Sequence, residues 1–316
     1  MLGADLNTMG EALKASLHSD VPLLNSINED IMSRSGKMLR PTVAVAMARA
    51  CNHGICTAEG IRYAAAVEIL HNATLLHDDV ADMASTRRGA PTVYSAYGPT
   101  PAVLVGDFWL SSAVRLLCDS KDLSWIIEVF CQTLTDLSEG EMLQQQKAFL
   151  ADTTEEDYLR IVYCKTASLF VAACTSAVKS SGGDPAYLEA ARNYGEALGI
   201  AFQIKDDIMD YSCGEDAGKP AGIDLMEQKI TLPLLGAIRN SGREAEIRSL
   251  VREIPSKPDN CKILRTIVLE NAGLDYAASR LEDYVRKACM ALESLPASKE
   301  KDLLADIAKY NLLRTK

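Results

Sequence analysis

Aromatic residues are scarce in this chain of 316 residues, where they make up only 6% of the sequence. A core with so few rings must be aliphatic and rich in alanine, which favours helices over a β-sandwich. Gly (19) and Pro (11) are also too few for a loop-rich or fibrous protein. Long alternation of apolar and β-branched positions is nearly absent, so we expect very little strand.

Paired cysteines, an excess of basic residues and long apolar runs are missing as well. The nine Cys include no CxxC pair, and their odd number argues against a disulfide framework, so a reducing cytoplasm fits best. A formal net charge of −10 argues against nucleic acid as the main partner, although an anionic small ligand needs only a local basic pocket. The N-terminus does not resemble a signal peptide, and no apolar run reaches the roughly 18 residues of a spanning helix. We therefore expect a soluble, cytoplasmic protein.

Helix punctuation is frequent along the chain. Pro41 is placed to open a helix, Thr153 and Glu156 have the spacing of a capping box, and 182–185 reads as a helix stop followed by a new start. Helices are predicted over 57–83, 101–118, 122–150, 153–178, 185–211, 258–272 and 275–293, with non-helical segments at 84–100 and 212–231. Neither a composition shift nor an internal repeat is present. The prediction is one all-α domain over 1–316.

The predicted helix at 61–83 is apolar around most of its circumference, so it should be buried. It nevertheless carries His71, Asp78, Asp79 and Asp82. Of these, His71, Asp78 and Asp82 lie on nearly one face of the helix. Three carboxylates within five residues repel one another and lose hydration energy if buried. A cation must compensate them.

A second apolar helix, at 194–211, places Gln203, Asp206, Asp207 and Asp210 at i, i+3, i+4 and i+7, again on one face. Both clusters have the spacing Asp-Asp-x-x-Asp. If both faces point into one cavity, six carboxylates converge there. Mg²⁺ is the natural partner, because it binds oxygen ligands through few carboxylates together with substrate phosphates.

Other interpretations of the acidic clusters are weaker. A single such motif is most often a solvated helix face, but two copies inside apolar helices make that reading unattractive. The second cluster has no nearby His for zinc. A structural Ca²⁺ site would more typically lie in a loop rich in Asn and Gly.

Basic residues flank both clusters, and their positive charge would stabilise a bound phosphate. Each is more often a surface charge when taken alone, but their positions beside the acidic helices point to an anion site. They are Lys37 and Arg40 before the helix at Pro41, Arg87 and Arg88 after the first cluster, Lys165 with Thr166 in an apolar helix, and Lys219 and Lys229 after the second cluster.

Five motifs in order over about 30–235 resemble the trans-type polyprenyl diphosphate synthases, the superfamily of farnesyl and geranylgeranyl diphosphate synthases. They are LLHDDVAD, RRGAPT, AFQIKDDIMDY, GKPAGIDL and QKITLP. The resemblance implies a bundle of long helices around a deep central cavity (the isoprenoid synthase fold), usually as a homodimer. It also implies head-to-tail condensation of isopentenyl diphosphate with an allylic diphosphate.

The resemblance further implies a role for each residue. Asp78, Asp79, Asp82, Asp206, Asp207 and Asp210 would hold several Mg²⁺ ions bridged to the allylic diphosphate. Lys37, Arg40, His71 and Arg88 would grip isopentenyl diphosphate, and Arg87, Lys165, Lys219 and Lys229 the allylic diphosphate. Thr166 and Gln203 would lie beside the allylic cation. The usual Gly-Gly-Lys reads Ser35-Gly36-Lys37 here, and Met38 stands where relatives often have Arg, but no predicted charged residue is lost.

Product length follows from the residues four and five positions before Asp78. Thr74 and Ala73 lie about 6–7.5 Å from Asp78 along the helix axis. In family members that make short products, large aromatic side chains at these positions resemble a plug in the channel. Both side chains are small here, which predicts a product longer than a geranylgeranyl chain, such as the side chain of a quinone. Leu70, Phe108 and Met142 are candidates for the floor of the channel.

Four alternatives stay open: a short-chain farnesyl or geranylgeranyl diphosphate synthase, a class I terpene cyclase, a metal-dependent diphosphate hydrolase, and a non-catalytic subunit of a heteromeric synthase. Cyclases commonly change the second acidic motif and do not need the isopentenyl diphosphate grip. Regulatory subunits tend to lose one acidic motif. Both motifs and the grip at Lys37, Arg40 and His71 are intact, which favours condensation.

Overall fold

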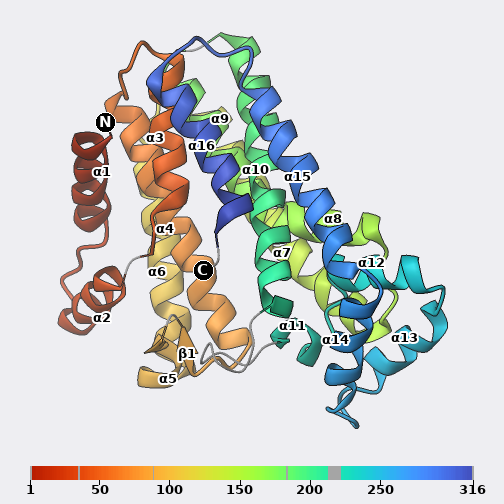
Figure 1. Ribbon diagram of the computed structural model, residues 1–316. Helices are drawn as coiled ribbons and strands as arrows, with labels where there is room; N and C mark the ends of the chain where they lie inside the picture. Colours follow the sequence, from red (N-terminus) through yellow and green to blue (C-terminus); the bar gives the residue numbers. More distant parts are fainter. Residues whose placement is uncertain (1, 35, 88, 183, 213–221, 315–316) are drawn as a thin grey trace. The chain divides into compact units, whose positions relative to one another are not determined.

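The computed structural model describes residues 2–34, 36–87, 89–182, 184–212 and 222–314. Helices dominate these segments, which confirms the all-α fold class (Figure 1). The chain divides into two compact units: 1–131 with 172–191 and 294–304, and 132–171 with 192–293 and 305–316. The prediction of one domain stays a prediction.

The first unit contains the early helices and a short hairpin. Its elements are α1 (Gly3–Ser16), α2 (Pro22–Ser33), α3 (Leu39–Cys51), α4 (Ala58–Ala81), β1 (Thr86–Arg87), β2 (Ala90–Pro91), α5 (Val93–Tyr97) and α6 (Pro99–Leu117). The antiparallel pair β1–β2 pairs Thr86 with Pro91 and Arg87 with Ala90. Strands of two residues fit the near absence of strand signals in the sequence.

Helix α4 is the buried helix of this unit and packs against α1, α3 and α6. Thr57 caps its N-terminus, where the hydroxyl accepts a hydrogen bond from the Gly60 backbone N–H at 3.0 Å. At the other end Gly106 of α6 lies against His77, so closely that an added Cβ would stand 2.3 Å from the His77 Nε2. The small residue therefore lets α6 support the acidic end of α4.

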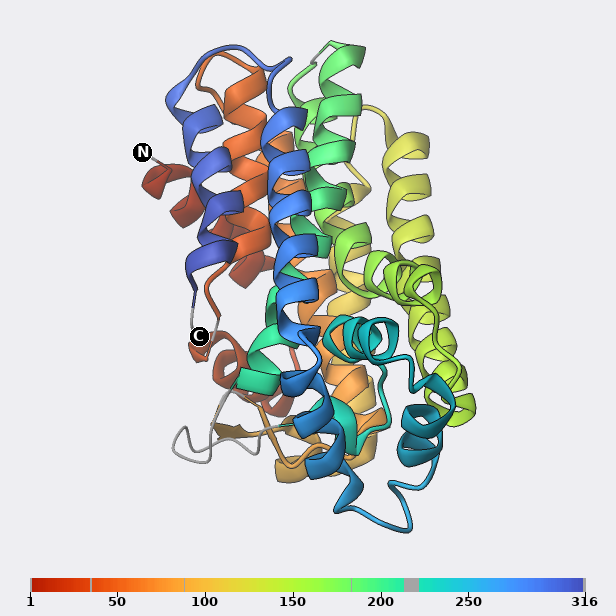
Figure 2. The ribbon, with the colours of Figure 1, turned by 45° about the vertical axis from the view of Figure 1, so that its right-hand side comes forward.

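The second unit has α10 at its core. Its own elements are α8 (Glu155–Val162), the π-helix η1 (Tyr163–Ala167), α11 (Ile223–Met226), α12 (Leu232–Ser241), α13 (Glu244–Arg252), α14 (Asn260–Glu270) and α15 (Gly273–Ala291). Four further helices contribute residues to both units: α7 (Leu123–Leu150), α9 (Ser168–Ser180), α10 (Pro185–Ser212) and α16 (Lys299–Leu313). Figure 2 shows α12, α13 and α14 grouped beside the lower end of α15.

Close approach to η1 and to the start of α9 fixes α10 in place. A Cβ at Gly199 would stand 2.4 Å from the Ala167 Cα, and a Cβ at Gly195 2.8 Å from the Phe170 carbonyl oxygen. Tyr194, one residue before Gly195, is completely buried. Helix α10 therefore presents its C-terminal half, with the second acidic cluster, beside the π-helix that carries Lys165.

The predicted helices over 57–83, 101–118, 122–150, 185–211, 258–272 and 275–293 agree with α4, α6, α7, α10, α14 and α15 to within a few residues. The helix predicted over 153–178 is interrupted by η1, and the non-helical segments contain the short helices α5 and α11. The capping box is wrong by one residue: Thr154 and Asp157 form it. Thr153 is buried instead, and its carbonyl accepts a hydrogen bond from Arg248.

Among the residues that the structure describes, one segment, 155–180, is long and apolar enough to cross a membrane by length and composition. However, 89% of its most apolar window is buried inside the protein, as in the core helix of a globular fold.

The capping box generates a stability prediction. Burial alone raises the pKa of Asp157, but hydrogen bonds from Thr154 and the charge of Lys147 outweigh it and lower the pKa. A carboxylate with a lowered pKa stabilises the fold above the pKa of the unfolded chain, and that contribution disappears as the pH falls below about 4. We expect Asp157→Ala to lower the free energy of unfolding by about 1 kcal/mol at pH 7 and by less at pH 3.

Denaturant unfolding at the two pH values measures this difference. Glu156→Ala is the matched control, because it removes an exposed carboxylate from the same helical turn. A larger loss of stability for Glu156→Ala than for Asp157→Ala would contradict the assigned capping box.

Candidate active site

The first acidic cluster lies at the C-terminal end of α4. Asp78 and Asp79 belong to the last turn, and Asp82 is the residue that follows the helix. Asp79 is buried, and Arg87 on β1 donates from Nε to its Oδ1 at 2.7 Å. Burial raises the pKa of Asp79, and the nearby Asp82 adds to this rise, whereas Arg87 offsets it only in part. Further positive charge would stabilise the ionised cluster.

A second polar pair lies two turns earlier on α4. The Nη1 of Arg40, at the start of α3, is 3.1 Å from the Nε2 of His71. Guanidinium nitrogens only donate, so Nε2 accepts and the ring proton of His71 is on Nδ1. Lys37 is exposed in the loop before α3. The first unit thus brings Arg40 to His71 and Arg87 to Asp79, while Arg88 lies outside the described residues.

A cavity of about 260 Å³ adjoins the Asp79–Arg87 pair in this unit, with Leu75, Leu76 and Ile31 among its lining residues. The predicted chain-length residues are not in that lining. Ala73 is fully buried, and the hydroxyl of Thr74 donates to the His71 carbonyl at 2.8 Å.

The candidate floor residues differ in burial. Leu70 is fully buried and Phe108 is half-buried. Met142 is 66% exposed, which argues against its place at the closed end of a channel.

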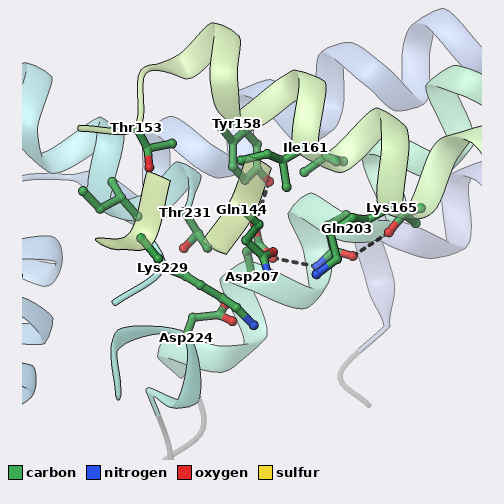
Figure 3. A pocket seen from close by; sticks show the side chains of 14 residues that line it. Gln144, Thr153, Tyr158, Ile161, Lys165, Gln203, Asp207, Asp224, Lys229 and Thr231 are labelled. Atoms are coloured by element: carbon green, nitrogen blue, oxygen red, sulfur yellow. Dashed lines mark hydrogen bonds between the residues drawn. The ribbon is translucent and has the colours of Figure 1, made fainter. Parts of the chain in front are cut away.

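Asp207 of the second acidic cluster lines a cavity of about 130 Å³ within the second unit, together with Gln203 (Figure 3). A chain of hydrogen bonds crosses it. The Thr166 hydroxyl donates to Gln203 Oε1 at 2.9 Å, and Gln203 Nε2 donates to Asp207 Oδ1 at 2.9 Å. The Tyr158 hydroxyl donates to Asp207 Oδ2 at 2.6 Å. Both oxygens of the buried Asp207 are therefore held in a fixed direction.

Desolvation dominates the electrostatics of this cavity. Burial, reinforced by Asp224, raises the pKa of Asp207, and burial with the charge of Asp210 raises the pKa of Asp224. Burial also raises the pKa of Asp210, although the backbone N–H groups of Ile223 and Asp224 donate to its carboxylate and offset part of the rise. A cation would allow all three carboxylates to ionise.

The remaining member of the predicted cluster, Asp206, contacts the end of the chain. Arg314 donates from Nη1 to Asp206 Oδ1 at 2.7 Å, and its guanidinium carbon lies 4.1 Å from the centre of the Phe202 ring. Gln203 and Asp207 line the cavity, whereas Asp206 does not. The residues predicted to share one face of α10 therefore separate, because Asp206 contacts Arg314 whereas Gln203 and Asp207 line the cavity.

Two lysines line the same cavity, and each has a glutamate partner. Lys165 on η1 forms an ion pair with Glu141 on α7, and Lys229 forms one with Glu227. Burial alone lowers the pKa of Lys229, but Glu227 and the other surrounding carboxylates outweigh it and raise the pKa. Lys219, the other lysine predicted here, lies outside the described residues.

Sequence reasoning missed four residues of this unit: Tyr158, Glu141, Asp224 and Arg314. Asp224 had a signal, because it belongs to the motif GKPAGIDL. The other three had none, since their partners are remote in sequence.

The donor set fits a hard divalent cation. The residues are carboxylates with an amide and a hydroxyl nearby, and magnesium prefers oxygen ligands. Within the part of the chain that the structure describes, no three His, Cys, Asp or Glu side chains form a ready-made metal site. Magnesium characteristically binds through one or two carboxylates plus substrate phosphates.

Comparison with known proteins decides the family. The model of the polyprenyl synthetase family matches residues 21–268. The chain belongs to the polyprenyl synthetase family. An octaprenyl diphosphate synthase of Haemophilus influenzae is 38% identical over 98% of this chain and 94% of that protein. An all-trans-nonaprenyl-diphosphate synthase of Rhodobacter capsulatus is 36% identical over 98% of this chain and 95% of that protein.

A solved structure agrees with this assignment. The polyprenyl synthase of Caulobacter crescentus, complexed with calcium and isoprenyl diphosphate, has a TM-score of 0.90 and 35% identity over 100% of this chain and 96% of that one. The predicted family, the isoprenoid synthase fold and the prediction of a long-chain all-trans polyprenyl diphosphate synthase are confirmed. As a member of this family, the chain is a prenyltransferase.

The hydrogen bonds around Asp207 generate a prediction. Tyr158→Phe removes one of the two donors to this carboxylate, and a hydrogen bond to a charged group contributes about 1.5–3 kcal/mol. We expect magnesium pyrophosphate to bind at least tenfold more weakly, as measured by titration calorimetry. Tyr163→Phe is the matched control, because it makes the same change on η1. Unchanged affinity in Tyr158→Phe would show that Asp207 needs no orientation by this hydroxyl.

Proposed function

We propose that this chain condenses isopentenyl diphosphate head-to-tail with an allylic diphosphate and releases an all-trans polyprenyl diphosphate longer than a geranylgeranyl chain. The observation that carries the proposal is the cavity of the second unit. There the buried and oriented Asp207 lies beside Lys165 and Lys229. Carboxylates next to lysines suit a ligand that is an anion together with its metal ions.

Magnesium is the proposed metal, and its ligands come from both acidic clusters. When bound, it would withdraw charge from the diphosphate leaving group and so favour cleavage of the allylic C–O bond. The proposed ligands are Asp78, Asp79, Asp82, Asp206, Asp207 and Asp210. Burial raises the pKa values of Asp79, Asp207 and Asp210, so a cation would stabilise their ionised carboxylates.

The basic residues would position the two substrates. Lys165, Lys229, Arg87 and Lys219 neutralise the allylic diphosphate, and Lys37, Arg40, His71 and Arg88 hold isopentenyl diphosphate. The observed Arg40–His71 contact supports the second group, because it keeps the guanidinium fork beside the helix that carries Asp78. Holding both reactants in one orientation converts a bimolecular reaction into an effectively unimolecular one.

Thr166 and Gln203 are proposed to lie beside the developing allylic cation. Their hydrogen bond directs the Gln203 oxygen toward Thr166 and its NH₂ group toward Asp207, so the dipole is fixed before the reaction. The double-bond electrons of isopentenyl diphosphate then form the new C–C bond. The proton lost from the adjacent carbon passes to the departing diphosphate.

The direct test of this function uses the purified chain alone with Mg²⁺, farnesyl diphosphate and isotopically labelled isopentenyl diphosphate. Mass spectrometry of the products should show prenyl chains that grow by whole isoprene units beyond a geranylgeranyl chain. Release of diphosphate without elongation would favour a cyclase or a hydrolase. Turnover only after a partner protein is added would favour a subunit of a heteromeric synthase.

We also propose that the enzyme acts in the cytoplasm as a homodimer. The eight cysteines among the described residues are free thiols, which fits a reducing compartment. Val103, Leu104 and Val114 expose apolar side chains on α6, and such a row suits a subunit interface. Light scattering on the purified chain gives the oligomeric state.

Product length gives a further prediction. Ala73 and Thr74 have small side chains, which fits the long products named for the relatives from Haemophilus influenzae and Rhodobacter capsulatus. We expect Ala73→Phe to shorten the main product, because the added ring blocks the growing chain. Chromatography of the dephosphorylated alcohols measures the length.

Ala73→Ser is the control of nearly equal volume and should leave the product length unchanged. A folded Ala73→Phe variant that makes the wild-type product would place the channel elsewhere.

A further inference from the structure

Glu141 is a charged residue that the proposed mechanism does not use. It lies on α7, and its Oε2 pairs with the ammonium group of Lys165. Lys165 lines the cavity of the second unit, whereas Glu141 does not. The carboxylate therefore contacts the lysine without lining the cavity. Both side chains keep only about a quarter of their surface exposed, at 27% for Glu141 and 26% for Lys165.

The backbone forces this pairing. Helix α7 lies so close to η1 at Gly140 that an added Cβ would stand 2.6 Å from the Cys164 Cβ and 3.0 Å from the Lys165 Cγ. Any larger residue at 140 would push α7 away. The π-helical turn at Tyr163–Ala167 also places both Lys165 and Thr166 against the cavity. The contact is thus built into two helices and does not depend on a flexible surface chain.

The carboxylate of Glu141 interacts electrostatically with both lysines of the cavity. Burial alone raises the pKa of Glu141, but the charges of Lys165 and Lys229 outweigh it and lower the pKa. Glu227 pairs with Lys229 in the same way. Each cationic side chain named here therefore has a carboxylate beside it. The lysines add little net positive charge to a cavity that also contains Asp207 and Asp224.

We infer that Glu141 is a positioning residue that makes diphosphate binding depend on metal ions. Its carboxylate holds Lys165 at the cavity and cancels the charge that would otherwise attract a bare diphosphate. A diphosphate that arrives with magnesium carries its own compensation, and it can share Lys165 with Glu141. This inference rests on the proposed function, because it assumes that the cavity receives a diphosphate.

The experiment compares inorganic pyrophosphate binding with and without Mg²⁺ by titration calorimetry. Glu141→Gln keeps the shape of the side chain and removes its charge. We expect bare pyrophosphate to bind about tenfold more tightly to Glu141→Gln than to the wild type, as expected for one unscreened charge near a protein surface. The gain in affinity on adding Mg²⁺ should shrink by a similar factor.

Two variants separate charge from structure. Glu141→Asp keeps the charge on a shorter side chain and should restore the dependence on metal. Glu227→Gln makes the matched change beside Lys229 and should also strengthen binding of bare pyrophosphate. A purely structural role for Glu141 would lower the thermal midpoint and weaken binding in both conditions.

The outcomes distinguish the two proposals. Weaker or unchanged binding of bare pyrophosphate to folded Glu141→Gln would overturn the role of Glu141, even if the wild type binds magnesium pyrophosphate and elongates prenyl chains. Failure of the wild type to bind pyrophosphate under either condition would overturn the proposed function, and this inference with it.

Discussion

Desolvated carboxylates near the ends of α4 and α10 are the constraint on which the rest of the site depends. Apolar helices bury Asp79 and Asp207, and burial raises the pKa of both. The two positions are compensated in different ways. Arg87 provides a full charge to Asp79, whereas Asp207 receives neutral donors from Gln203 and Tyr158. A cation is consequently most needed in the cavity of the second unit, where Asp224 and Asp210 add to the negative charge.

Close packing between helices holds the residues of this cavity in place. Gly199 brings α10 against η1, and Gly140 brings α7 against the same turn. Side chains at either glycine would separate the helices that carry Thr166, Lys165 and Asp207. Tight packing thus maintains a polar network whose members would otherwise move toward water.

The elements that positioned the acidic clusters were predictable, because their periodicity is local. The apolar faces at 61–83 and 194–211 specify α4 and α10 without knowledge of their neighbours. The capping box was displaced by one residue, since Thr153 and Thr154 are both good caps and only burial distinguishes them. The interruption by η1 had no sequence signal.

Partners remote in sequence were not predictable from spacing. Tyr158 reaches Asp207 from 49 residues away, and Arg314 reaches Asp206 from 108 residues away. Glu141 is one of four acidic residues on α7, and only the fold places it beside Lys165. The motifs identified the chemistry, while the network that tunes it depends on tertiary contacts.

We propose that both acidic clusters bind one metal-bound diphosphate. A double-mutant cycle on the affinity for magnesium pyrophosphate, with Asp78→Asn, Asp207→Asn and the double variant, measures this most directly. We expect a combined loss that differs from the sum of the single losses by about 1 kcal/mol or more. Additive losses would contradict this proposal.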